Sequence, residues 1–266
     1  MQSVKSASLH FGMASIPCKM FKAIESHDLS GHLHHGPDCL GSIGFKKVCK
    51  ECGEEVAHSD IVKGYTSSDG NTVIVTQEEI NTLDTEQDTG LEVVDFVPAD
   101  KVDPIYYETT YYLAADVKSK QGGKAAEKNY AVLLHVLRKS ERVAIVRFTL
   151  RQKTYAGVLR AYGDVLVVHR MVWADEIRST GELVRAQIDL PDMEVEMAEK
   201  LVALMSSDDW DPTILTDRYT ERLGELIESK SVGDEFVVTS NDDDDAAGDL
   251  LAKLTASIAA LEKKAA

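Results

Sequence analysis

Residues 143–172 read VAIVRFTLRQKTYAGVLRAYGDVLVVHRMV, and they contain the clearest strand pattern of the sequence. Apolar and polar residues alternate along three segments, 143–150, 154–162 and 165–172, as they do in strands that bury one face. Short turn-forming sequences separate the segments, which favours an antiparallel meander. The core of the protein is therefore expected to be β-rich.

On both sides of the meander the strand pattern continues and then changes to helices. Further strands are expected within 4–24 and at 61–65, 72–75, 91–97 and 105–113, and helices at 76–83, 124–137, 193–205 and 214–230. The fold class is thus α+β and β-rich, with a small helical C-terminal module. The expected boundaries are 1–190 for the core with a Cys-rich insertion at 32–56, 191–233 for the helical module, and 234–266 for an acidic linker and an amphipathic tail helix.

The hairpin within the meander is predicted to gather arginines on one face. If residues 152–153 form a two-residue loop, Arg147 pairs with Val158. Arg147, Arg151 and Arg160 then project from one face of the sheet, and the apolar residues between them fill the core. With no carboxylate among them, these arginines favour an anion such as phosphate, which the guanidinium group matches in geometry. The alternative is a solvated face with salt bridges to distant acidic residues.

Charge is distributed very unevenly along the chain. The formal net charge of the 266 residues is −16, yet residues 118–170 contain 12 Lys and Arg against 3 Asp and Glu. Residues 179–266 contain 8 Lys and Arg against 21 Asp and Glu. A protein of this kind can bind a polyanion at one place while the rest of its surface repels it.

Three of the four cysteines cluster with histidines in a pattern typical of zinc sites. Cys49 and Cys52 form a CxxC knuckle followed by Gly53, and Cys39 lies upstream. His35 is the expected fourth ligand, although His34 and His32 are alternatives. Such a site would be structural, because nothing indicates an open catalytic position. Without a metal, the cluster would be inert thiols and solvated histidines.

Several functional classes lack support in the sequence. It has no GxSxG elbow, no GxGxxG and no GxxxxGK[ST], so neither a hydrolase nor a nucleotide cofactor is expected. His135 and His169 are interpreted as structural histidines. No apolar run approaches the roughly 20 residues of a membrane span, and the N-terminus lacks a signal-peptide pattern. The expected location is the cytoplasm, associated with the nucleoid.

Five long motifs resemble those of the prokaryotic Ku family, the DNA-end-binding component of bacterial non-homologous end joining. They are HFGMASIPCKMF at 10–21, VCKECGEEV at 48–56, VDPIYYETTYYLAAD at 102–116, VAIVRFTLRQKTYAGVLR at 143–160 and MVWADEIR at 171–178. Residues 211–230, DPTILTDRYTERLGELIESK, resemble the helical segment that ends the core of that family. Many members end in a lysine-rich tail, whereas the tail here is acidic and then amphipathic.

The resemblance implies a β-barrel core with a bridge that dimerises into a ring around duplex DNA. It also implies sequence-independent binding of DNA ends, no catalytic activity, and recruitment of an ATP-dependent DNA ligase by the helical module. The candidate DNA contacts are Arg147, Arg151, Lys153, Arg160, Lys118, Lys120, Lys124, Lys46 and Lys47. The candidate partner-binding residues are Tyr219, Leu223, Leu226 and Ile227, and the candidate zinc ligands are His35, Cys39, Cys49 and Cys52.

Two other classes of protein remain as alternatives. The chain could be a metal-dependent nuclease whose carboxylates form no recognised motif, and cation-dependent cleavage would favour this class. It could also be a zinc-bearing adaptor whose basic face binds an acidic protein. Binding that is indifferent to DNA length and ends would favour the adaptor.

Overall fold

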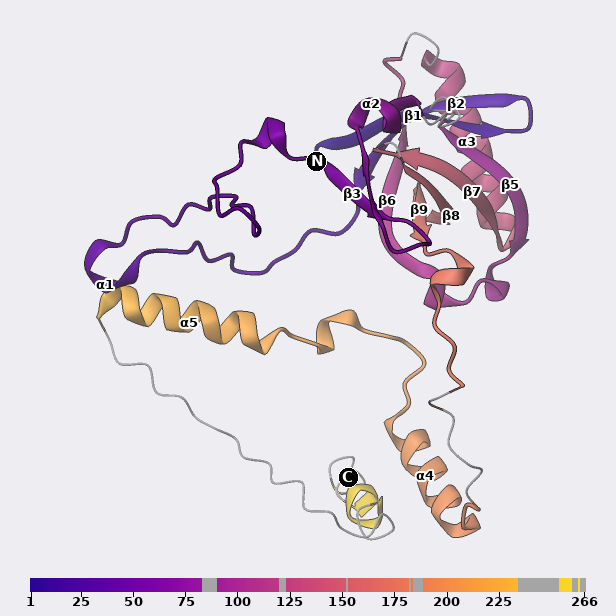
Figure 1. Ribbon diagram of the computed structural model, residues 1–266. Helices are drawn as coiled ribbons and strands as arrows, with labels where there is room; N and C mark the ends of the chain where they lie inside the picture. Colours follow the sequence, from indigo (N-terminus) through magenta and orange to yellow (C-terminus); the bar gives the residue numbers. More distant parts are fainter. Residues whose placement is uncertain are drawn as a thin grey trace. The chain divides into compact units, whose positions relative to one another are not determined.

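The chain divides into two compact units in a computed structural model (Figure 1). The described residues are 1–82, 90–119, 123–151, 153–181, 183, 189–233, 254–259 and 263. The first unit comprises Met1–Ser26 and His32–Ser179, and the second comprises His27–Gly31 and Thr180–Ala266. The short segment His27–Gly31 therefore folds with the C-terminal helices, although it interrupts the first unit in sequence.

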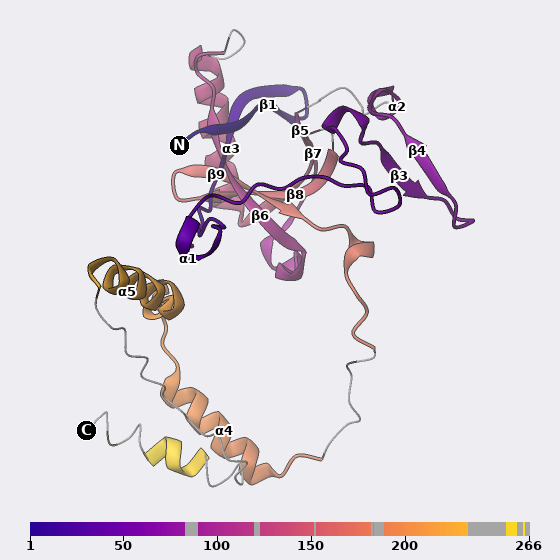
Figure 2. The same ribbon diagram turned by 60° about the vertical axis from the view of Figure 1, so that its left-hand side comes forward.

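Seven of the described strands close into a barrel in the order β1-β2-β6-β9-β8-β7-β5 (Figures 1 and 2). They are β1 (Ser3–Phe11), β2 (Ala14–Lys22), β5 (Leu91–Pro98), β6 (Tyr107–Ala115), β7 (Arg142–Leu150), β8 (Lys153–Tyr162) and β9 (Val165–Met171). β1 pairs with β5 in parallel, and the other neighbours are antiparallel. The predicted meander is confirmed as β7, β8 and β9.

Alternation along the strands places one face of the sheet in a single hydrophobic core. The core side chains include Leu9, Ile16, Met20, Leu113, Ala144, Val146, Phe148, Leu159, Leu166 and Val168. Helix α3 (Gly123–Ser140) joins this core through Tyr130, whose hydroxyl donates to the Leu113 carbonyl oxygen at 2.6 Å and accepts from the Leu166 amide at 2.7 Å. The helix is thus hydrogen-bonded to two strands as well as packed against them.

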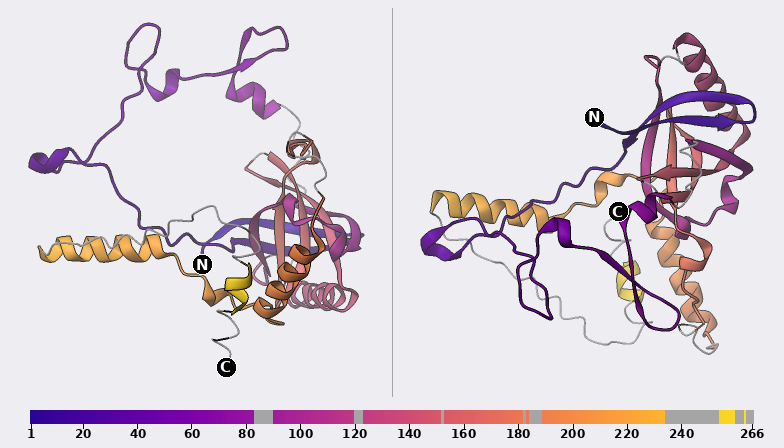
Figure 3. Two further views of the ribbon diagram at one scale, coloured as in Figure 1. Left: turned by 90° about the horizontal axis from the view of Figure 1, so that it is seen from below. Right: turned by 45° about the horizontal axis from the view of Figure 1, so that its top comes forward.

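A long insertion separates β2 from β5 and consists of short elements joined by extended chain (Figure 3). Its elements are α1 (Gly36–Cys39), β3 (Lys63–Thr66), β4 (Thr72–Val75) and α2 (Gln77–Thr82), and β3 and β4 pair as a two-stranded sheet. A capping box begins α2: the Thr76 hydroxyl accepts from the Glu79 amide at 3.2 Å, and the Glu79 carboxylate accepts from the Thr76 amide at 2.8 Å.

The second unit contains α4 (Asp192–Met205) and α5 (Arg218–Val232). α5 begins four residues later than the sequence pattern indicated, because Asp217 caps its N-terminus. Short 3-10 turns occur at His58–Asp60, Ala99–Lys101, Pro104–Tyr106, Ala174–Glu176 and Pro212–Ile214. In the expected tail helix, residues 254–259 are helical and Ile258 is buried, whereas Leu250, Leu251 and Leu261 lie outside the described residues.

Candidate functional site

Arg147 on β7 and Arg160 on β8 lie on the face of the barrel wall that points away from the core. Arg147 forms a salt bridge with Glu92 at 3.0 Å, and both side chains are about half exposed. Arg160 donates from Nε to Nε2 of His169 at 2.8 Å, and its guanidinium group lies 5.4 Å from the centre of the Tyr162 ring. Each guanidinium is oriented by a neighbour in the wall, which reduces the entropy lost when it binds an anion.

Three details of the predicted hairpin are wrong. Arg147 pairs with Ala156 rather than Val158, so the register differs by two residues. A shift of two preserves the faces, and Arg147 and Arg160 still share one face as predicted. Arg151 is not on this strand face: it lies in the turn between β7 and β8 with φ 50°. The face also contains a carboxylate, because β5 brings Glu92 beside Arg147.

The other candidate DNA contacts occupy separate places. Arg151 and Lys153 lie at the end of the barrel where the β7–β8 turn is located. Lys118 and Lys124 come after the C-terminal end of β6, which is at the other end of the barrel. Lys46 and Lys47 belong to the insertion, where Lys46 forms a salt bridge with Glu55 at 2.7 Å. Lys120 lies outside the described residues. Of the nine basic residues, the described ones therefore form no single surface.

His169 on β9 is a buried structural histidine, as predicted. Burial lowers its pKa, and the positive charge of Arg160 lowers it further, so the imidazole is neutral near pH 7. Because Nε2 accepts from Arg160, the proton resides on Nδ1, which donates to the Thr110 hydroxyl at 2.9 Å. The ring also stacks on Tyr107 with centroids 4.9 Å apart. His169 is thus a neutral acceptor that positions Arg160.

The sequence did not predict a second carboxylate–arginine pair, formed by Glu108 on β6 and Arg170 on β9. The Glu108 carboxylate accepts from Nε of Arg170 at 2.8 Å and also from Nη2. The guanidinium lies 4.7 Å from the centre of the Tyr155 ring. Glu108 and Arg170 meet where the pairing of β6 with β9 shifts register between Tyr107 and Thr110. Neither this shift nor the order of strands in the barrel is visible in the local sequence pattern.

Hydrogen bonds within the cysteine knuckle converge on Cys49. Backbone amides of Cys52 and Glu51 and the Cys52 thiol donate to Cys49, and these hydrogen bonds lower the pKa of the Cys49 thiol. Across the described residues, however, no three His, Cys, Asp or Glu side chains gather closely enough to hold a metal ion. His35 precedes α1 and Cys39 is its last residue, and the two do not complete a site with the knuckle. Whether the four predicted ligands bind zinc therefore stays a prediction.

Cys18 is a small buried residue of β2, as predicted. Burial raises the pKa of its thiol to about 12, with a smaller contribution from the charge of Asp116. A thiol of this kind stays protonated and unreactive at physiological pH.

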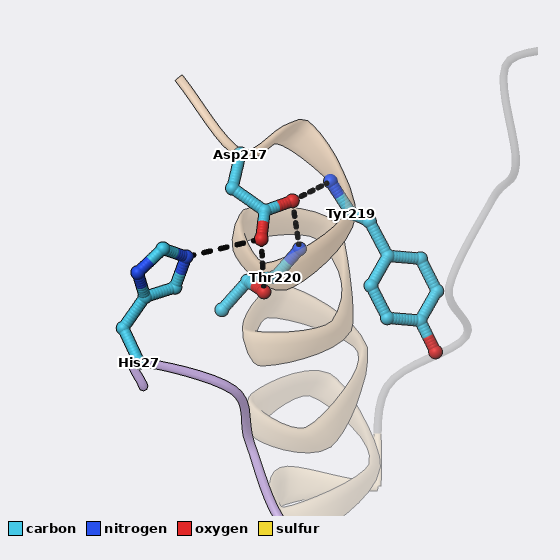
Figure 4. Close-up of polar contacts among 4 residues, drawn as sticks. All are labelled: His27, Asp217, Tyr219 and Thr220. Carbon is cyan, nitrogen blue, oxygen red and sulfur yellow. Dashed lines mark hydrogen bonds and ion pairs between the residues drawn. The ribbon is translucent and has the colours of Figure 1, made fainter. Parts of the chain in front are cut away.

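The second unit is organised around the N-terminus of α5 (Figure 4). The Asp217 carboxylate accepts from the amides of Tyr219 and Thr220 at 3.0 and 3.1 Å and from the Thr220 hydroxyl at 2.7 Å. Its other contact is His27, whose Nε2 lies 3.1 Å away. One carboxylate therefore caps the helix and joins it to the segment His27–Gly31. Among the predicted partner-binding residues of α5, Tyr219 and Ile227 are exposed, and Leu223 and Leu226 are partly exposed.

We expect Asp217→Ala to unravel the first turn of α5, while Asp217→Asn, which keeps a capping oxygen, preserves it. Hydrogen bonds from Thr220, His27 and Tyr219 hold the pKa of the Asp217 carboxyl at about 2, below its ordinary value near 4. A depressed carboxyl pKa stabilises the fold above the unfolded pKa, and this stabilisation is lost as the pH falls from about 4 to 2. Circular dichroism at 222 nm, recorded for the parent and both variants as the pH is lowered, measures the helix content and tests both expectations. Equal helix content in the two variants at pH 7 would contradict it.

The comparisons with known proteins agree with this geometry. The model of the family described as Ku70/Ku80 beta-barrel domain matches residues 10–201. The chain belongs to the Ku family. It is 37% identical to the non-homologous end joining protein Ku of Mycolicibacterium smegmatis, covering 98% of this chain and 82% of the relative. It is also 37% identical to the protein of the same name from Mycobacterium tuberculosis strain CDC 1551, covering 99% and 97%.

A further Ku relative comes from a virus. Protein Ku of Mycobacterium phage Corndog is 36% identical over 100% of this chain and 95% of the relative. The resemblance and the β-rich barrel fold expected from the motifs are thereby confirmed. No helix in the described part of this Ku-family chain is both long enough and apolar enough to span a membrane.

Proposed function

We propose that this Ku-family chain binds the ends of double-stranded DNA without sequence preference, as a ring-shaped homodimer acting in non-homologous end joining. The observation that carries the proposal is the excess of cations in residues 118–170, which contain 12 Lys and Arg against 3 Asp and Glu in an otherwise acidic chain. The relatives named as non-homologous end joining proteins support the pathway. Oriented arginines such as Arg147 and Arg160 suit phosphate contacts, which give salt-dependent and sequence-blind affinity.

The insertion supports the homodimer as part of this proposal. Large apolar side chains are exposed all along it, from Leu33 to Ile74, and Phe45 is 84% exposed. Contiguous exposed apolar surface is typical of protein–protein interfaces. In the proposed homodimer, a second copy of the chain would cover this surface with the same segment. Sedimentation of the full chain and of a Phe45→Asp variant tests the idea, and a monomeric wild-type protein at micromolar concentration would overturn it.

The helices of the second unit support a role in docking the ATP-dependent DNA ligase. Neither α4 nor α5 buries a side chain among the described residues, and Met193, Val202, Met205 and Ile227 are exposed. Amphipathic helices with exposed apolar faces commonly bind a groove in a partner. Replacing Tyr219 and Ile227 together by aspartate is expected to abolish stimulation of the ligase while DNA binding is retained.

We also propose a structural zinc ion in the insertion. The knuckle supplies Cys49 and Cys52 as thiolates, and Cys39 and His35, which precede it in the sequence, are the further ligands proposed. Zinc commonly gathers its ligands as it binds, so that binding and local folding are coupled. Elemental analysis of protein purified without chelators is expected to find about one zinc ion per chain. The Cys49→Ser, Cys52→Ser double variant should contain none. A wild-type protein that contains no zinc would contradict the proposed zinc site.

The primary test is a gel-shift comparison of one plasmid-derived duplex as a linear form and as a closed circle, over about 50 to 200 mM salt. Binding to the linear form alone, weakening with salt, is expected of a ring that threads onto an end. Blocking both ends of the linear duplex with bound streptavidin should prevent loading. Equal binding to circle and line would overturn the ring and favour an open phosphate-binding face or an adaptor.

The proposed clamp acts without catalysis and without a nucleotide cofactor, in the cytoplasm and in association with the nucleoid. Incubation with the linear duplex and Mg²⁺ or Mn²⁺ should leave every end intact. Cleavage that requires the cation and persists after extensive purification would instead favour the metal-dependent nuclease.

A further inference from the structure

A cavity of about 340 Å³ opens at the end of the barrel where the β7–β8 turn lies. Three cations line it: Lys22 from the end of β2, Arg151 from the turn, and Arg170 from β9. Two tyrosines and Thr109 contribute hydroxyl groups, and none of the described residues that line the cavity is acidic. These walls combine positive charge with hydrogen-bond donors, the composition that recognises an oxyanion.

Arg170 is held in a fixed orientation at the edge of this cavity. Its Nε and Nη2 donate to the Glu108 carboxylate, which lies outside the lining, and its guanidinium packs 4.7 Å from the centre of the Tyr155 ring. A guanidinium group has five N–H donors, so two directed to Glu108 leave others for a second anion. Preorganisation of this kind lowers the entropic cost of binding.

Arg151 adopts an unfavourable backbone conformation to occupy its place. Its φ of 50° lies in the left-handed region, which Gly and Asn adopt far more readily in two-residue hairpin turns. An arginine at such a position introduces backbone strain that the fold does not require, and strained residues cluster at functional sites. The turn itself therefore does not explain an arginine at position 151. We attribute the residue to what its side chain does in the cavity.

The hydroxyl groups in the cavity are donors at physiological pH. Burial raises the pKa of Tyr111, as does the nearby Tyr155, while the charge of Arg151 lowers it by a smaller amount. The phenol consequently stays protonated. A neighbouring cavity of about 490 Å³ shares Tyr155 and Arg170 and is lined also by Lys153, Trp173 and the carboxylates of Glu108 and Glu176. These carboxylates disfavour the phosphate itself there, but the cavity has room for an organic group attached to it.

We propose that this end of the barrel is a binding site for a phosphate monoester, with the phosphate in the three-cation cavity and the group that carries it in the neighbouring one. A terminal phosphate has up to two negative charges and three acceptor oxygens, which suits three cations and adjacent hydroxyl groups. The source is either the 5′-phosphate of a DNA strand or a soluble phosphorylated compound. In the first case the inference rests on the proposed DNA-end function; in the second it stands apart from it.

The test is a titration of full-length protein with inorganic phosphate, followed by tryptophan fluorescence. A Trp210→Phe background leaves Trp173, which lines the neighbouring cavity, as the reporter. We expect saturable binding that Lys22→Ala and Arg151→Gly each weaken about tenfold. Glycine suits the φ of Arg151, so this variant should fold at least as well as the parent. Lys101→Ala, which removes a cation outside both cavities, should bind phosphate like the parent.

Two outcomes would overturn the site: no saturable signal with phosphate, or the same curve for Arg151→Gly and Lys101→Ala. Tighter binding of a 5′-phosphorylated trinucleotide than of phosphate or ribose 5-phosphate would support the site with DNA as its source. The reverse order would support it with a soluble source. Selectivity for linear over circular duplex, measured on the same proteins, reports on the ring separately, so the failure of one proposal is distinguishable from the failure of the other.

Discussion

Arg147→Ala is expected to weaken binding to linear duplex by about tenfold or more at 0.1 M salt, equally for every sequence. It should also reduce the slope of log K against log salt by about 2, because a homodimer loses one phosphate contact from each subunit and each contributes about 0.9. The physical basis is the position of Arg147 on the outward face of β7, with its side chain half exposed. Fluorescence anisotropy over a salt series measures both quantities.

Glu92→Gln is the matched counterpart and should act in the opposite direction. The Glu92 carboxylate lies 3.0 Å from the Arg147 guanidinium and competes with phosphate for it. Neutralising this carboxylate is expected to tighten DNA binding and to make the salt slope steeper. In a protein that already carries Arg147→Ala, Glu92→Gln should have little further effect on DNA binding, because the guanidinium group that Glu92 pairs with is absent. Unchanged affinity and slope in both single variants would place the DNA contacts elsewhere on the chain.

The faces of the barrel strands could be predicted from the sequence, but their register could not. Alternation of apolar and polar residues fixes which face is buried, so Phe148 and Leu159 were assigned correctly to the core and Arg147 to the opposite face. A register error of two residues leaves these assignments unchanged. The turn is where the error lies, since nothing in the local pattern indicated that Arg151 itself has a positive φ.

Contacts between strands that are distant in sequence were beyond the reach of these patterns. Glu92 meets Arg147, and Glu108 meets Arg170, because the barrel places β5 beside β7 and β6 beside β9. Closure order depends on the packing of the whole core rather than on any local spacing. The cysteine knuckle shows the same difference between local contacts, which the sequence can indicate, and tertiary contacts, which it cannot. The hydrogen bonds around Cys49 follow from a four-residue motif, whereas gathering His35 and Cys39 with it requires a tertiary arrangement.

Phe148→Ala is expected to lower the free energy of unfolding by about 3–5 kcal/mol, the range for truncating a buried aromatic side chain. Phe148 is 2% exposed and packs against Tyr155, with ring centroids 5.8 Å apart. An alanine there leaves a cavity between β7 and β8 that the closed barrel cannot readily collapse, because its neighbours are fixed by pairing on both sides. Equilibrium denaturation at a fixed protein concentration measures the change.

The control for this prediction is Ile105→Ala, which truncates an apolar side chain that is 59% exposed in the 3-10 turn before β6. Its effect should stay within about 0.5 kcal/mol, as for most surface substitutions. If Phe148→Ala has the same free energy of unfolding as this control, burial of the Phe148 side chain does not stabilise the barrel core. If it unfolds at room temperature, Phe148→Leu, which keeps most of the apolar volume, should restore the fold and allow the difference to be measured.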